Sequence, residues 1–166
     1  MRRLLGVVLV LSSILGVRFG EAQNRPVVAP RGSSLTAAPQ SNLTFGEVFP
    51  GIRSTVSNRD NKRAGRFQIR GPKNTSVRID MILPQAMTST GGNEMPLEFG
   101  PSDGLAASNP GRQSGMAFNP WEPLVTVLGN NGRLYIRLGG SALPAIAQAP
   151  GTYSATIFLT VYSLGT

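Results

Sequence analysis

The sequence contains no cysteine and no histidine. These two absences exclude the Ser-His and Cys-His pairs that activate many catalytic nucleophiles, and they remove the usual ligands of zinc. A chain without cysteine also has no disulfides, so its fold must be stabilised by a hydrophobic core and by backbone hydrogen bonds. We therefore expect a protein that is not an enzyme, with no catalytic, cofactor-binding or metal-binding residues and no cofactor.

Charged residues are also scarce, at 14% of the chain, whereas 20 glycines and 13 prolines supply many turns. The acidic residues beyond residue 22 show no spacing that pairs two carboxylates for glycoside hydrolysis or forms a calcium-binding loop. These residues are Glu47, Asp60, Asp80, Glu94, Glu98, Asp103 and Glu122. Few charges, many turn formers and short apolar runs are typical of a sandwich or barrel of strands.

The charge that is present is mostly positive, with 16 Lys and Arg against 8 Asp and Glu and a net charge of +8. Basic residues are concentrated in the first half of the chain: Arg53, Arg59, Lys62, Arg63, Arg66, Arg70, Lys73 and Arg78. One interpretation is a solvated strand face with an adjoining loop. The other is a surface for an anionic partner, such as a polysaccharide, a lipid headgroup or a nucleic acid. Phe67 lies among them, but we expect it in the core rather than as a stacking platform, so no specific nucleic acid is predicted.

The N-terminus has the order of regions that is typical of a secretory signal peptide. A basic head at residues 1–3 precedes an almost wholly apolar run at 4–17, which is shorter than the roughly 20 residues that a membrane-spanning helix needs. Small residues follow, and we place cleavage after Ala22 or one residue later. The alternative is a retained anchor helix. The signal peptide predicts export to the periplasm, the outer surface or the medium. No second apolar run is long enough to span a membrane, so the mature chain is expected to have no transmembrane span.

The sequence beyond the signal peptide divides into two parts. Residues 23–42 are rich in Pro, Ala, Ser and Gln, and their prolines cannot donate to a strand ladder, which predicts an extended N-terminal arm. Residues 43–166 form the predicted domain. In this domain apolar residues recur with a period of two, as half-buried strands require.

The expected fold is all-β, an antiparallel sandwich of about eight strands. The strands are expected near 43–48, 53–57, 67–70, 77–83, 95–99, 116–118, 124–128, 133–138 and 152–162. Residues 101–114 are expected to be a loop, Asn130-Asn131-Gly132 a hairpin turn, Gly139-Gly140 the end of a strand, and Trp121 a plug at one end of the core. The last strand is the most regular. Its apolar face consists of Tyr153, Ala155, Ile157, Leu159 and Val161.

Four blocks of sequence together resemble one family. They are LTFG at 43–46 with PG at 50–51, AGRFQIRG at 64–71, SVRI at 76–79, and PGTYSAT at 150–156. Their order and spacing are similar to those of a bacterial family of exported domains of unknown function, numbered 4402, which is related to spore coat protein U and to archaic chaperone–usher pilins. The resemblance implies an immunoglobulin-like sandwich displayed or polymerised at a bacterial surface, and no catalytic residues. The chain differs from spore-coat-U-type pilins in lacking cysteines and in its basic first half.

Pilins of that group polymerise when an N-terminal extension of one subunit completes the sheet of the next, so copies of this chain or a periplasmic chaperone are the implied partners. Residues 23–38 stand where such a donor strand would be. The candidate partner-strand contacts are Val27, Ala29, Leu35 and Ala37 in the donor, and Tyr153, Ala155, Ile157, Leu159 and Val161 in the acceptor. A self-complete monomeric sandwich is the alternative, because Pro26 and Pro30 leave the donor few clean alternating positions.

Two functions follow from the sequence. The first is a structural or surface protein, such as a pilin-like or coat subunit. The second is an envelope-associated binding module that holds an anionic glycan or a partner protein on its basic face or its Pro-Gly loops.

Overall fold

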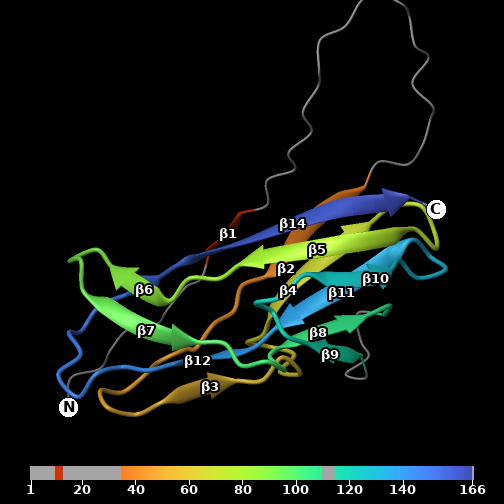
Figure 1. Cartoon of the computed structure of the whole chain (residues 1–166). Helices are drawn as coiled ribbons and strands as arrows, with labels where there is room; N and C mark the ends of the chain where they lie inside the picture. Colours follow the sequence, from red (N-terminus) through yellow and green to blue (C-terminus); the bar gives the residue numbers. More distant parts are fainter. Residues whose placement is uncertain (1–9, 13–34, 110–114, 166) are drawn as a thin grey trace, which may run out of the picture.

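The computed structural model of the chain describes residues 10–12, 35–109 and 115–165. Within these ranges every regular element is a strand, and almost all strand pairs are antiparallel (Figure 1). The all-β prediction is confirmed. In the part of the chain that the structure describes, no helix has the length and apolarity needed to cross a membrane.

The first sheet contains the C-terminal strand. It has the order β1 (Val10–Ser12), β14 (Thr156–Gly165), β5 (Ser76–Ile82) and β10 (Leu124–Val127). β5 is antiparallel to both of its neighbours, whereas the short β1 runs parallel to β14. Alternate residues of β5 and β14 are buried, as the period of two in the sequence predicts.

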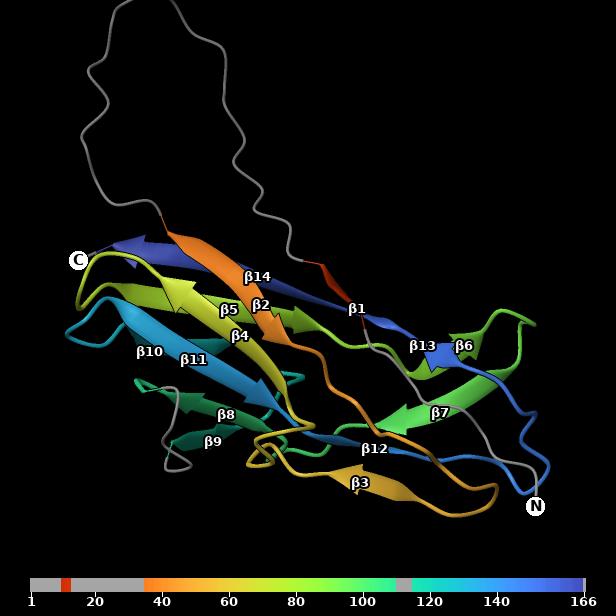
Figure 2. The same ribbon diagram turned by 180° about the vertical axis from the view of Figure 1, so that it is seen from behind.

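The second sheet is antiparallel throughout and has the order β2 (Thr36–Ser41), β4 (Gly65–Arg70), β11 (Arg133–Leu138), β8 (Gly104–Ala107) and β9 (Met116–Phe118). β2 lies against β14 of the first sheet, so these two strands meet along the same side of the molecule (Figure 2).

A third sheet lies at one end of the molecule and draws on both layers (Figure 1). Its order is β13 (Tyr153–Ser154), β6 (Ala86–Ser89), β7 (Glu94–Glu98), β12 (Gly140–Ala142) and β3 (Ser54–Val56). β6 follows β5, β13 precedes β14 and β12 follows β11 along the chain. Strands of the two main sheets therefore continue, after a bend, into one shared sheet.

The core is a single apolar cluster contributed by all three sheets. It includes Phe67 and Ile69 of β4, Ile136 of β11, Ile79 of β5 and Leu159 of β14, all nearly inaccessible to solvent. Complete burial of one such side chain stabilises a fold by about 1.5–3 kcal/mol. A cluster of this kind accounts for a cysteine-free domain that holds together without disulfides.

The expected strand at 43–48 is wrong in its conformation, although its apolar residues are buried as predicted. Leu43, Phe45 and Val48 all belong to the core, but this segment pairs with no strand beyond an isolated bridge at Gly46. The pairing is made by the residues before it, because β2 occupies the edge beside β4. Alternating apolar residues indicate that one face of a segment is buried. A segment can be buried in this way without hydrogen bonding to a neighbouring strand, so the alternation alone does not establish a strand.

The N-terminal arm predicted at 23–42 is divided in the structure. Residues 23–34 lie outside the described residues, whereas Thr36–Ser41 forms β2, with Ala37 opposite Ile69 and Pro39 opposite Phe67 of β4. Pro39 is tolerated because β2 is the edge strand of its sheet, and the register shifts between Pro39 and Ser41.

One expected boundary is corrected and another is confirmed. The predicted loop at 101–114 contains β8, which is buried along its whole length. The strand that begins at Arg133 ends before Gly139-Gly140 as predicted, because β11 stops at Leu138, and a new strand of the third sheet, β12, begins at Gly140. At Gly139 the backbone of the neighbouring segment passes so closely that a Cβ would lie 2.5 Å from the carbonyl oxygen of Val56, so only glycine fits without a shift.

The turn at Asn130-Asn131-Gly132 forms, but it does not make a hairpin. Gly132 has a φ of +67°, and Asn131 Oδ1 accepts a hydrogen bond from the Arg133 amide at 3.0 Å. The strands on either side belong to different sheets, because β10 pairs with β5 and β11 pairs with β4 and β8. The turn therefore carries the chain across the sandwich.

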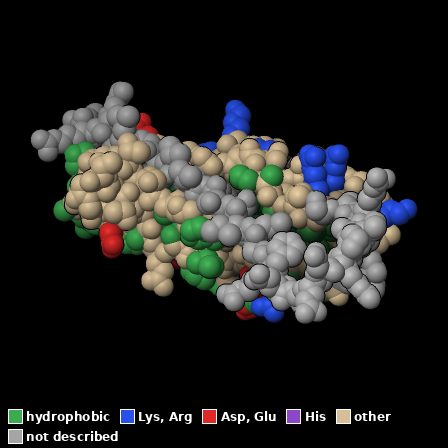
Figure 3. Space-filling view, turned by 90° about the horizontal axis from the view of Figure 1, so that it is seen from above, with side chains coloured by type: hydrophobic (Ala, Val, Ile, Leu, Met, Phe, Trp, Pro, Cys, Tyr) green, Lys and Arg blue, Asp and Glu red, His purple; other side chains and the backbone are tan. Residues whose placement is uncertain are grey.

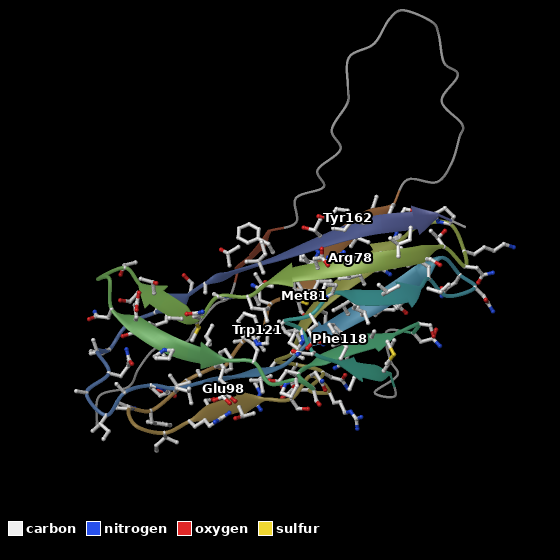
Figure 4. All side chains as sticks on the ribbon, viewed as in Figure 1. Arg78, Met81, Glu98, Phe118, Trp121 and Tyr162 are labelled. Carbon is white, nitrogen blue, oxygen red and sulfur yellow. The ribbon has the colours of Figure 1, made fainter. Side chains whose placement is uncertain are left out.

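The expectation that Trp121 plugs the core is wrong. Its side chain is 49% exposed, and its indole Nε1 donates to the carbonyl oxygen of Phe99 at 2.9 Å (Figure 4). The two rings meet edge to face, with centroids 6.2 Å apart. Phe99 is the buried member of the pair, and Trp121 covers it from outside.

Candidate functional site

One side of the first sheet is formed by β14, the longest described strand with ten residues, together with the short β1 beside its first residues. On one side it pairs with β5 from Phe158 opposite Ile82 to Ser163 opposite Val77. On the other side only Thr156–Phe158 are paired, with β1. Among the described strands, none pairs with Leu159–Tyr162 on that side. In the described part of the chain, Leu159–Tyr162 therefore form a ladder with β5 alone, while β2 of the second sheet also lies against β14.

The side chains predicted to contact a donor strand pack instead into the core of their own domain. Tyr153, Ile157, Leu159 and Val161 are buried in the core, and Ala155 is half-buried against it. The structure thus brings these residues together on one face, as the sequence predicts, but that face is turned inward. What the edge of β14 offers to another strand is its backbone.

The side chains predicted as donor contacts are not brought together by the structure. Leu35 and Ala37 are half-buried against the domain's own core, at the start of β2. Val27 and Ala29 lie outside the described residues. The donor hypothesis therefore now rests on the segment before Leu35.

The outer face of the first sheet carries an unusual number of exposed apolar side chains. Ile82 is 67% exposed and Val125 60%, and the remaining large ones are Val127, Tyr162 and Leu164. Figure 3, which views the molecule from above, shows hydrophobic side chains in green at the surface among Lys and Arg side chains in blue. An exposed apolar patch on a sheet is typical of a surface that contacts another protein.

A shallow hollow of about 380 Å³ lies on the same outer face, lined by Arg78, Asp80, Tyr162 and Leu164. Tyr162 stands opposite Arg78 across the β14–β5 ladder (Figure 4). Arg78 Nε donates to Asp80 Oδ1 at 2.9 Å, and this contact raises the pKa of the arginine. The sequence predicts Arg78 on a solvated strand face or on a surface for an anionic partner, but it does not predict the hollow, because alternation shows which side a residue is on and not what shape that side has.

The chain just before β14 contains a buried hydrogen-bonded tyrosine. Tyr153 Oη donates to the carbonyl oxygen of Ala149 at 2.7 Å and accepts from Gln148 Nε2 at 2.7 Å. The same amide group of Gln148 donates to the carbonyl oxygen of Glu94, which ties the segment to β7. A tyrosine that bonds back to the backbone four residues upstream resembles the tyrosine corner of immunoglobulin-like sandwiches.

Some of the basic residues form exposed ion pairs. Arg53 contacts Glu98 at 3.1 Å, and Arg63 contacts Asp60 at 2.9 Å. Asp60 also accepts hydrogen bonds from the backbone amides of Lys62 and Arg63. These bonds lower the pKa of Asp60 to about 2, the amide of Lys62 contributing most. The carboxylate therefore stabilises its own turn.

No protein-family model matches the chain, and no curated protein matches it. The resemblance to the exported-domain family therefore stays a prediction. Within the described residues, no group of three or more acidic side chains is arranged to hold a metal ion.

Proposed function

We propose that the chain is an exported, non-catalytic structural subunit with an immunoglobulin-like fold, and that another copy adds a strand along the edge of β14. The observation that carries this proposal is the character of that edge. β14 reads TIFLTVYSLG, with no proline and no charged residue. Natural proteins usually protect edge strands with charges, prolines or short length, and a long uncharged edge is a template for pairing with another chain.

Three further features support the immunoglobulin-like, surface-assembled interpretation. The hydrogen bond from Tyr153 to Ala149 has the geometry of a tyrosine corner. The outer face of β14, β5 and β10 exposes apolar side chains next to the same edge, so a neighbouring subunit would find apolar surface to cover. Main-chain bonds to an added strand then supply affinity, and the flanking side chains supply specificity.

The predicted export of the chain also supports the proposal, because removal of the signal peptide would remove β1. Val10–Ser12 lies inside the predicted signal peptide, and it occupies the outer side of β14 at Thr156–Phe158. Cleavage after Ala22 would remove this strand and leave Thr156–Tyr162 with no ladder partner among the described strands on the outer side of β14. That pairing supports the proposal, because it places an extended segment on the outer side of β14.

The donor in this scheme is the segment that precedes β2. Residues 23–34 are joined to the domain at Leu35, and an extended chain of that length reaches about 40 Å, enough to contact a neighbouring subunit. Val27 and Ala29 remain the candidate apolar positions, between Pro26 and Pro30. Only a short ladder fits between two prolines, so we expect each junction between subunits to have few main-chain hydrogen bonds and a low affinity.

The absence of cysteine makes a disulfide test direct. The full coding sequence carrying Val28→Cys and Thr160→Cys would be expressed in a bacterial host, and the exported protein would be oxidised and run on a non-reducing gel. Thr160 is half-buried in β14, so it offers a thiol beside the proposed junction. We expect a ladder of disulfide-linked species, because each subunit then has one donor and one acceptor thiol.

The matched control pairs Val28→Cys with Ser54→Cys on β3, where Ser54 is half-buried like Thr160 but lies on an edge strand of the third sheet. A ladder of equal intensity from both pairs would refute a specific junction at β14. A second variant without residues 23–34 keeps β2 intact and should elute as a compact monomer. Identical elution of the exported chain with and without that segment would refute donor-strand assembly.

A further inference from the structure

The outward face of the second sheet carries two pairs of arginines. The apolar residues of β4 and β11 point into the core, so the intervening residues share the opposite face. Across the ladder they form three opposed pairs: Arg66 with Arg137, Gln68 with Tyr135, and Arg70 with Arg133. Like charges placed directly opposite each other destabilise a sheet, so two such pairs on one face need a reason.

The inner pair, Arg66 and Arg137, has the less favourable surroundings for its charge, because Arg137 is buried and Arg66 is only partly exposed. Arg137 is only 1% exposed, and its Nη2 donates to Asn61 Oδ1 at 2.8 Å. Arg137 Nε, Arg137 Nη1 and Arg66 Nε are all buried and find no hydrogen-bond acceptor among the described residues. Three guanidinium nitrogens on two adjacent side chains are therefore unsatisfied within the described chain, and buried donors of this kind normally have a partner.

The charge of the inner pair is not neutralised by an acidic neighbour. Burial and the charge of Arg66 both lower the pKa of Arg137, and Asp60 raises it only in part. The Asp60 carboxylate is already engaged by Arg63 and by two backbone amides of its own turn. Arginine stays protonated under these conditions, so the site keeps an excess of positive charge.

The outer pair extends this charge along the surface. Arg70 and Arg133 are exposed, and Arg70 is oriented by two hydrogen bonds from Nε and Nη2 to Gln68 Oε1, at 3.0 and 2.8 Å. Gln68 in turn donates to the hydroxyl of Tyr135 at 2.8 Å. The two arginine pairs lie four positions apart along each strand, which is about 13 Å in an extended chain. Two fixed sites at that separation suit anionic groups that repeat along a polymer.

We propose that the outward face of β4 and β11 binds an acidic polysaccharide, with one carboxylate or sulfate group held by Arg66 beside Arg137 and the next held by Arg70 and Arg133. Arg66 is partly exposed and receives the first oxyanion, while the buried Arg137 opposite it on β11 supplies further positive charge. Charge-assisted bonds from guanidinium groups to oxyanions are the strong class of protein hydrogen bonds.

Two observations favour a polysaccharide over a nucleic acid. The aromatic residue on this face, Tyr135, is half-buried and engaged by Gln68, so it offers no free ring on which a base stacks. The arginines are also confined to two strands instead of lining a long groove. The face belongs to the sheet opposite β14, so it does not depend on strand addition.

The test measures binding of the exported chain to immobilised polygalacturonate, dextran sulfate, uncharged dextran and single-stranded DNA at fixed salt. We expect binding to at least one of the first two, and the preferred polymer identifies the anionic group. Arg66→Gln should weaken that binding by about tenfold or more, as expected for the loss of a charge-assisted bond. Lys73→Gln, an equal change of charge at an exposed turn, is the matched control.

Arg137→Met gives a second readout through melting temperature. A bound polymer stabilises the native state, so it should raise the melting temperature of the original chain and raise it much less in this variant. Equal losses of binding in Arg66→Gln and Lys73→Gln would overturn the proposal in favour of non-specific attraction. Tighter binding to DNA than to either acidic polysaccharide would also overturn it, as would binding to none of the charged polymers.

Discussion

The hydroxyl of Tyr153 offers a sharp test of how the last strand is anchored. Tyr153→Phe removes one oxygen atom from a residue with no exposed surface and leaves the ring in place. The change breaks the bond to the Ala149 carbonyl and the bond from Gln148 Nε2. Gln148 Nε2 keeps its second acceptor, the carbonyl oxygen of Glu94 at 3.0 Å. The Ala149 carbonyl oxygen, in contrast, loses the hydroxyl that donates a hydrogen bond to it.

The magnitude follows from these contacts. A typical hydrogen bond contributes about 0.5–1.5 kcal/mol net, and a buried group left without its partner adds about 1–3 kcal/mol. One bond is partly compensated and the other is lost, so we expect the free energy of unfolding to fall by about 1.5–3 kcal/mol. The ring still fills its place, so no cavity contributes.

Urea unfolding of the exported chain, followed by circular dichroism, measures this loss. With a urea m-value of about 2 kcal/mol per molar, the midpoint should fall by about 1 M while the slope stays unchanged. Tyr162→Phe is the control, because it removes the same atom from an exposed tyrosine of the adjoining strand and should change stability by less than about 0.5 kcal/mol. Equal midpoints for Tyr153→Phe and the original chain would refute the idea that this hydroxyl anchors β14.

Three other changes test separate parts of the fold. Asp60 has a folded-state pKa of about 2, below its ordinary 3.8, so the stability that it contributes is present above pH 3.8 and is lost as the pH falls through about 2. Asp60→Asn should therefore flatten the acid side of the melting-temperature profile, and an unchanged profile would contradict this account. Gly139→Ala should cost about 1–3 kcal/mol in urea unfolding because its Cβ would meet Val56; Gly100→Ala, whose nearest atom lies at 3.5 Å, should be nearly neutral, and similar losses would count against steric crowding. Arg53→Gln should change stability by less than about 1 kcal/mol, because its pair with Glu98 is half exposed on both sides, and a larger loss would show that the hydrogen bond to Ser141 matters more than the ion pair.

Strand periodicity predicts those parts of this fold in which one face is buried. β5 and β14 alternate in sequence and in burial, and the sequence identifies both; β11 is identified by its alternating sequence, although Arg137 on its polar face is buried as well. β8 was missed because its Gly104–Ala107 segment is buried on both faces and so has no alternation to detect. β2 was missed for a different reason, since a proline-containing segment at a sheet edge reads as an arm unless its partner is known.

The candidate sites required pairing information that a sequence does not contain. The sequence shows an arginine at 66 and another at 137, but nothing in it places them opposite each other on neighbouring strands. The same holds for the edge of β14, because its long apolar alternation predicts a strand and does not indicate which side has a neighbour. Periodicity reports the direction of side chains, whereas register and sheet order arise from contacts between distant segments.

The antiparallel ladder between β14 and β5 also has a mechanical consequence. A load applied along the axis of β14 acts parallel to that strand, so the hydrogen bonds from Phe158–Ile82 to Ser163–Val77 are strained together in shear. A load applied across the strand would instead break them one after another. At its other end the same strand continues through β13 into the shared third sheet, where the force divides between the two layers of the molecule. A fibre joined through β14 would therefore extend little before its domains unfold.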